Sequence, residues 1–192
     1  MEENQNFQIE SQKPEPVSKL NSAAVNGLKL AAISIIISLL ASFLPKSGTG
    51  IFISFLVSLV KLAATVTFLW WAMKSFSVRN AAIEGYTTYG NVFSYGLLTS
   101  LFSGIVLAAY SFIYMKWIDP QSVETLKEES MAQIEQINGI DTGIMEMFFN
   151  NMEMWSVIGT LVSAMFYGLI FSAILASSTK INPNPFNWQN NQ

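Results

Sequence analysis

VFSYGLLTSLFSGIVLAAYSFIYM, at residues 92–115, is a run of 24 positions without a charged side chain. A helix needs about 20 predominantly apolar residues to cross the roughly 30 Å hydrocarbon core of a bilayer. Three further stretches meet this length, at residues 24–44, 51–73 and 155–177. The four stretches make up nearly half of the 192 residues, so the sequence predicts a chain that crosses the membrane four times.

The composition agrees with this prediction and excludes many kinds of site. Charged residues make up 12% of the chain, against about 25% in soluble domains. The sequence has no His and no Cys, so the usual zinc and thiol sites and the Ser-His or Cys-His dyads lack their residues. The four stretches contain no Asp or Glu, which argues against proton relays within the membrane.

The net charge of −3 argues against a nucleic-acid-binding surface. We therefore expect no enzyme, no catalytic residue, no cofactor, no metal site and no nucleic-acid partner. The partner that the composition does predict is the lipid bilayer itself.

Polar segments flank the predicted membrane domain, which spans residues 23–180. Residues 1–22 are polar, contain two prolines and show no apolar periodicity, which is typical of a disordered tail. Residues 181–192 are rich in Asn, Pro and Gln and predict a second tail. The first tail is too long and too acidic for a cleavable signal, so we expect the first stretch to remain as an anchor.

Residues 116–154 separate the third and fourth stretches and carry eight acidic side chains and two lysines. Asp119-Pro120 is typical of a helix start, and Asn138-Gly139 of a helix end. Apolar side chains between them recur at spacings of three and four, with glutamates opposite. The predicted fold is therefore an all-α bundle of four transmembrane helices with an acidic amphipathic helical insert between spans three and four. We expect the insert to pack on the bundle or to bind a protein partner.

The distribution of Lys and Arg predicts the orientation, since cytoplasmic loops carry an excess of these residues. With four spans, both termini and the central loop share one side of the membrane. That side has five basic residues, Lys13, Lys19, Lys74, Arg79 and Lys180, and the other side has three, Lys46, Lys116 and Lys127. We therefore expect both termini to be cytoplasmic.

Lys61 is the most unusual residue of the predicted spans, because it lies near the middle of residues 51–73. A charged lysine there costs roughly 2.5–3.5 kcal/mol on insertion scales. Ser54, Ser58 and Thr65 lie on the same helix face and form a polar stripe with it. This stripe is the candidate intramembrane site, for an anion or a lipid phosphate. The alternative is a lysine that is only tolerated and bends toward the headgroups.

Small residues recur at every fourth position in three of the spans. Such ladders allow helix backbones to approach closely, so they predict tight packing within the bundle. The alternative is a face for homo-oligomers. The ladders are Ser34, Ser38 and Ser42; Gly96, Ser100, Gly104 and Ala108; and Ala164, Gly168, Ser172 and Ala176.

Several short motifs resemble a known family. EGYTT and YGNVF at residues 84–93 lead into the third stretch, IYMKWIDP at residues 113–120 ends it, and an acidic helical segment precedes the last span. This order resembles a family of small bacterial inner-membrane proteins, classified as a domain of unknown function, over residues 22–180. The resemblance implies four helices and a bacterial inner membrane, and it brings no catalytic or binding residue.

Two functions remain open from the sequence. The first is a non-enzymatic accessory or interaction protein that binds its partner through the acidic insert. The second is a small oligomeric transporter or pore component in which Lys61 and its polar stripe line the path.

Overall fold

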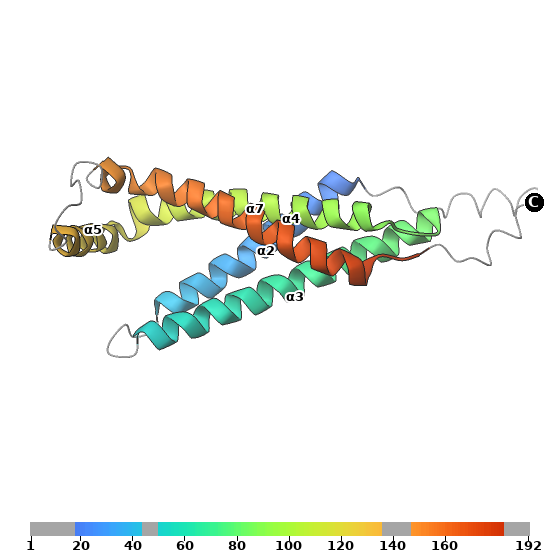
Figure 1. The fold of residues 1–192 in the computed structure, drawn as a ribbon, viewed down its shortest axis with the longest axis horizontal. Coiled ribbons are helices and arrows are strands. Elements are labelled where there is room, and N and C mark those ends of the chain that lie inside the picture. Colours follow the sequence, from blue (N-terminus) through green and yellow to red (C-terminus); the bar gives the residue numbers. More distant parts are fainter. Residues whose placement is uncertain (1–17, 44–49, 136–146, 183–192) are drawn as a thin grey trace, which may run out of the picture.

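A computed structural model describes residues 18–43, 50–135 and 147–182 of the chain (Figure 1). These residues form helices, and the part described contains no strand beyond one isolated bridge. Four helices are long and apolar enough to cross a membrane. They are α2 (Lys19–Ser42), α3 (Gly50–Glu84), α4 (Tyr89–Ile113) and α7 (Met152–Thr179). The predicted all-α fold with four membrane-spanning helices is confirmed, and the protein is a multi-pass membrane protein.

The predicted tails fall mostly on residues 1–17 and 183–192, which lie outside the described residues, as does the predicted helix end at Asn138-Gly139. α2 begins at Lys19, so the last residues of the segment expected as a tail are helical. Ser18 caps this helix, since its side chain accepts a hydrogen bond from the backbone of Asn21.

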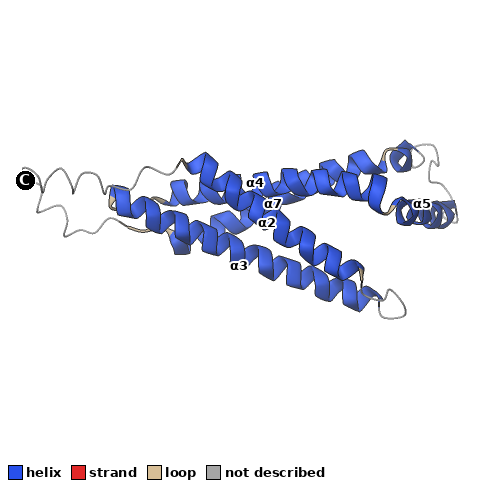
Figure 2. Cartoon of the chain, turned by 180° about the vertical axis from the view of Figure 1, so that it is seen from behind, coloured by secondary structure: helices blue, strands red, loops and turns tan. Residues whose placement is uncertain are grey.

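The four helices form a V (Figures 1 and 2). At one end, the start of α2, the end of α3, the start of α4 and the end of α7 lie together, and we call this the packed end. Toward the other end, α2 and α3 diverge as one arm from α4 and α7, which form the second arm. This end is the open end.

The second arm is held by interlocking small residues, which makes α4 and α7 an antiparallel pair. A Cβ atom built on Gly96 would lie 2.5 Å from the Ser172 Oγ, and one on Gly168 would lie 2.5 Å from the Ser100 Cβ. One built on Gly104 would lie 2.5 Å from the Ala164 Cβ. Each step forward on α4 is therefore matched by an equal step backward on α7. The predicted close packing within the bundle is confirmed for these two ladders.

α2 joins this pair through a different residue from those expected. A Cβ atom on Gly27 would lie 2.8 Å from the Thr99 carbonyl oxygen and 3.1 Å from the Ser103 nitrogen, so α2 crosses directly over the α4 backbone. The serine ladder of α2 does not make this contact. Gly27 lies on the same side of α2, two turns before Ser34 and nearer the packed end.

The hydrophobic core lies at the packed end. Leu69, Met73 and Phe76 of α3 are buried there against Val92 and Tyr95 of α4. The Phe76 and Tyr95 rings stack with centroids 4.1 Å apart. This end of the V is therefore the closely packed part of the molecule.

The second and third predicted stretches leave residues 74–91 between them, so the sequence predicts a loop there, and the structure corrects this expectation. α3 continues without interruption to Glu84, and only residues 85–88 form the turn, where Gly85 has a φ of 81°. At about 1.5 Å per residue, the 35 residues of α3 extend roughly 52 Å, which exceeds the hydrocarbon thickness. A bridge between Thr87 and Ile181 joins this turn to the segment that follows α7.

A short π-helix, η1 (Tyr114–Ile118), follows α4, and α5 (Pro120–Glu135) begins immediately after Asp119. Asp119 and Pro120 thus stand where the sequence predicts a helix start. Glu124, Glu128 and Glu129 of α5 are exposed. Figure 1 shows α5 at the open end, beyond the α4 and α7 arm.

Candidate functional site

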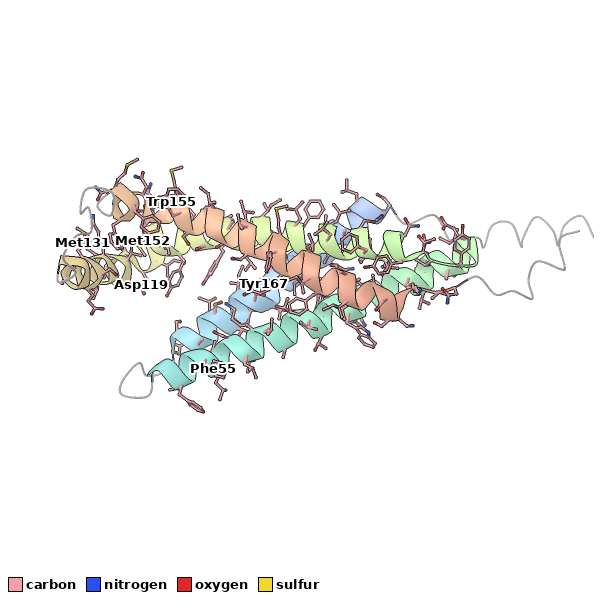
Figure 3. The ribbon with its side chains drawn as sticks, in the orientation of Figure 1. Phe55, Asp119, Met131, Met152, Trp155 and Tyr167 are labelled. Atoms are coloured by element: carbon pink, nitrogen blue, oxygen red, sulfur yellow. The ribbon has the colours of Figure 1, made fainter. Side chains whose placement is uncertain are left out.

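The space between the two arms is a groove of about 730 Å³. All four membrane-spanning helices contribute to its lining. Phe55 of α3 and Tyr167 of α7, both labelled in Figure 3, line it from opposite arms. The groove exists because the two arms diverge. The close contacts of α2 and α3 with α4 and α7 are confined to the packed end.

Hydroxyl groups line this groove on every side. They come from Ser34 of α2, Ser58 and Thr65 of α3, Ser100 and Ser103 of α4, and Ser156, Thr160 and Ser163 of α7. Apolar side chains, among them Leu62 and Phe171, fill the space between them. An apolar lining with a few polar groups is typical of ligand-binding pockets, which commonly hold about 300–1,000 Å³.

Lys61 is the charged residue among those that line the groove. Its Nζ donates a hydrogen bond of 2.9 Å to the Ser38 Oγ of α2, and the Ser38 Oγ donates in turn to the Ser34 carbonyl, at 2.8 Å. The residues that line the groove include no Asp and no Glu. The ammonium therefore gives the groove a positive charge that no lining carboxylate offsets.

Two of the other three residues of the predicted polar stripe line the same groove. Ser58 and Thr65 line it together with Lys61. The side chain of Ser54 lies outside the described part of the structure. Ser38, whose hydroxyl accepts the hydrogen bond from Lys61, belongs to the serine ladder of α2. The sequence predicts that this ladder serves helix packing.

Polar contacts join the two helices of each arm near the open end. The Lys61–Ser38 bond connects α3 to α2, and the Ser111 and Ser156 hydroxyls lie 2.8 Å apart between α4 and α7. The groove is thus bounded by two arms with internal polar contacts. Toward the packed end it is closed by the core around Leu69.

A smaller cavity of about 230 Å³ lies outside this groove, where η1, α5 and the start of α7 meet. Lys127 Nζ donates a 2.7 Å hydrogen bond to the Asn150 Oδ1 at this position. Figure 3 labels Asp119, Met131 and Met152 in this region. Among the residues that the structure describes, no three His, Cys, Asp or Glu side chains gather into a potential metal site.

Comparison with known proteins gives a family and no closer relative. No curated protein and no solved structure matches the chain. One family model, described as Protein of unknown function (DUF4199), matches residues 25–180. This range contains all four membrane-spanning helices except the first turns of α2. The chain therefore belongs to the family of proteins of unknown function DUF4199.

Proposed function

We propose that the protein is a non-enzymatic accessory protein of the bacterial inner membrane and that its groove binds an amphiphile with an anionic head. The observation that carries this proposal is the position of Lys61, whose ammonium faces the groove and bonds to Ser38 on the neighbouring helix. The resemblance to small bacterial membrane proteins supports the location. The lack of His and Cys supports a role without catalysis.

The energetics of Lys61 favour a role in binding. A lysine within a span costs roughly 2.5–3.5 kcal/mol, and one hydrogen bond between helices returns only about 0.6 kcal/mol. A carboxylate or phosphate acceptor carries a negative charge, so its bond to the ammonium adds an attraction that a neutral hydroxyl lacks. A carboxylate or phosphate in the groove would therefore stabilise the ammonium more than hydroxyl groups do. An acyl chain would lie against lining residues such as Phe55 and Leu62.

The charges at the two ends of the V support the proposed orientation, with both termini in the cytoplasm. Lys19, Lys74, Arg79 and Lys180 lie toward the packed end. Toward the open end lie two basic residues of the described part, Lys116 of η1 and Lys127 of α5, so the packed end has the excess. An excess of basic residues marks the cytoplasmic side.

The second candidate function is a small oligomeric transporter or pore component. The hydroxyl groups that all four helices contribute to one groove favour it. A single chain would not conduct through its own bundle, because the core around Leu69 and Met73 closes the groove at the packed end. Transport therefore requires an oligomer. If a monomer in nanodiscs retained transport, this candidate would be contradicted.

A protein partner at α5 is a further part of the proposed accessory role. The exposed side chains of Glu124, Glu128 and Glu129 support a partner with a basic surface. Reversal of these three charges is expected to abolish the co-purification of such a partner and to leave the groove unaffected.

Photolabelling of the full-length protein tests the groove. The probe is palmitate with a diazirine on its chain, and its neutral comparison is the methyl ester, both in phosphatidylcholine nanodiscs. We expect the acid to label groove residues about tenfold more than the ester, because only the carboxylate adds a charge that attracts the ammonium, and tenfold corresponds to about 1.4 kcal/mol. Lys61→Gln is expected to remove this difference.

Lys29→Gln is the matched control, since Lys29 is an exposed lysine on α2 that does not line the groove. It is expected to retain the preference for the acid. Equal labelling by the acid and the ester in the unaltered protein, or an unchanged preference in Lys61→Gln, would contradict the proposal.

A further inference from the structure

A second group of cations, outside the groove, converges at the packed end. Lys19, at the start of α2, donates a hydrogen bond from its Nζ to the Ser94 Oγ of α4. Arg79, near the end of α3, donates from its Nη2 to the Ser22 Oγ of α2, at 3.2 Å. Because Lys19 and Ser22 lie one turn apart on α2, both cations meet hydroxyl groups at the start of this helix.

These hydroxyl groups are held in place. The Ser22 Oγ lies 3.2 Å from the hydroxyl of Tyr95, and the Asn26 Nδ2 donates to the same hydroxyl at 2.6 Å. Tyr95 is fully buried and its ring stacks on Phe76. The Ser22 hydroxyl is thus held by the core of the packed end, and the Ser94 hydroxyl is held by its own helix, where it donates to the Gly90 carbonyl at 2.7 Å.

The two cations have no acidic partner within the described residues. Their hydrogen bonds go to hydroxyl groups and, from the Arg79 Nε, to the Ser75 carbonyl. Glu84, the nearest acidic residue along α3, accepts instead from the Asn80 Nδ2, at 3.0 Å. Neutral oxygens orient a cation and leave its charge uncompensated, so this site favours an anion.

The depth of the site matches the layer of lipid headgroups. Trp70 and Trp71 are exposed on α3, and exposed tryptophans are typical of the membrane interface. Arg79 lies two turns further along α3. Its bond to the Ser75 carbonyl turns the guanidinium back by one turn, toward the level of the tryptophans.

We propose that Lys19 and Arg79 bind the phosphate of an anionic phospholipid in the adjacent leaflet. A guanidinium presents two parallel N–H groups that match phosphate oxygens, and a lysine adds a compact charge. The Ser22 hydroxyl, which accepts from Arg79, can donate its own hydrogen to the same phosphate. This site is independent of the groove and of the ligand proposed there.

Lipid retention by the full-length protein tests the site. The protein is purified in mild detergent and incubated with equal amounts of phosphatidylglycerol and phosphatidylcholine, and native mass spectrometry measures the bound lipids. We expect a preference for phosphatidylglycerol. Lys19→Gln and Arg79→Gln should each lower it roughly fivefold, as expected for one cation at a membrane surface. Lys74→Gln, at an exposed position on α3, is the control and should retain it.

The outcomes separate the proposal from its competitors. Equal retention of the two lipids by the unaltered protein would overturn it, as would an equal loss in the Lys74→Gln control. If inorganic phosphate stabilised the purified protein as strongly as phosphatidylglycerol does, the assignment to a lipid would be overturned. If Arg79→Gln fails to fold, Arg79→Lys should fold and retain part of the preference. Palmitate labelling of the groove should be unchanged in all these variants, so failure here is distinct from failure of the proposed function.

Discussion

Gly168 on α7 lies so close to Ser100 on α4 that a Cβ atom at residue 168 would be 2.5 Å from the Ser100 Cβ. Real Cβ atoms do not approach this closely, so the two helices can keep their separation only while residue 168 is glycine. The same relationship recurs one turn away at Gly96 and Ser172. These contacts fix one arm of the V, and the groove depends on that arm.

Gly168→Ala is therefore expected to destabilise the bundle by about 1–3 kcal/mol, the usual cost of overpacking. Thermal unfolding in detergent measures the change. Gly159→Ala on the same helix is the control, because a Cβ atom there meets nothing within 4 Å. It should be neutral or stabilise the helix by up to about 1 kcal/mol. Equal effects at the two positions would contradict the register of α4 and α7.

A residue exchange tests the same register more directly. A Cβ atom on Gly104 would lie 2.5 Å from the Ala164 Cβ, so Gly104→Ala alone should destabilise the protein. Adding Ala164→Gly removes the opposing methyl group, and the double variant should recover most of the lost stability. Simple additivity of the two changes would show that these residues do not face each other.

The four spans were predictable because the thickness of the bilayer imposes a length on each apolar stretch. The end of α3 was not, because helix that extends beyond the hydrocarbon needs no apolar run, and residues 74–84 are mixed in polarity. Spacings of four at Gly96 or Gly168 predict close approach. They do not identify the partner helix, which depends on how the arms are arranged.

Only the residues that α3 contributes to the candidate site were predictable from the sequence. Lys61, Ser58 and Thr65 share one face by helical periodicity, and all three line the groove. The contact with Ser38 required knowledge of how α2 lies beside α3. The hydroxyl groups of α4 and α7 join the groove because the arms diverge, and hydropathy contains no information on that angle.

Tyr95→Phe is expected to destabilise the packed end by about 1–3 kcal/mol, because the Asn26 amide would lose its acceptor in a buried position. Tyr167→Phe is the matched control, since Tyr167 is exposed and lies in the groove. It should leave the unfolding temperature unchanged. Equal shifts for the two variants would indicate that the Tyr95 hydroxyl contributes nothing specific.

The orientation can be measured because the chain has no cysteine. Single cysteines at Ser11 and Ser130 are treated in intact cells with a thiol reagent that does not cross membranes. With both termini in the cytoplasm, the cysteine at residue 130 should react and that at residue 11 should react only after lysis. The reverse pattern would invert the topology and place α5 in the cytoplasm.

The bond between Lys61 and Ser38 allows the stability of the arm to be separated from its function. Ser38→Ala removes one interhelical hydrogen bond and should destabilise the bundle by about 0.6 kcal/mol. Lys61→Leu removes the same bond and also the cost of roughly 2.5–3.5 kcal/mol for a charge within the span, so it should leave stability unchanged or raise it.

In the Lys61→Leu background, Ser38→Ala should have no further effect, since the bond is already absent. Ser42→Ala serves as the control, because the Ser42 Oγ donates to its own helix at the Leu39 carbonyl. Unfolding in detergent provides the stabilities and palmitate labelling provides the function. A Lys61→Leu variant that is stabilised yet loses acid-dependent labelling is the expected result. One that is stabilised and still prefers the acid would show that Lys61 is merely tolerated.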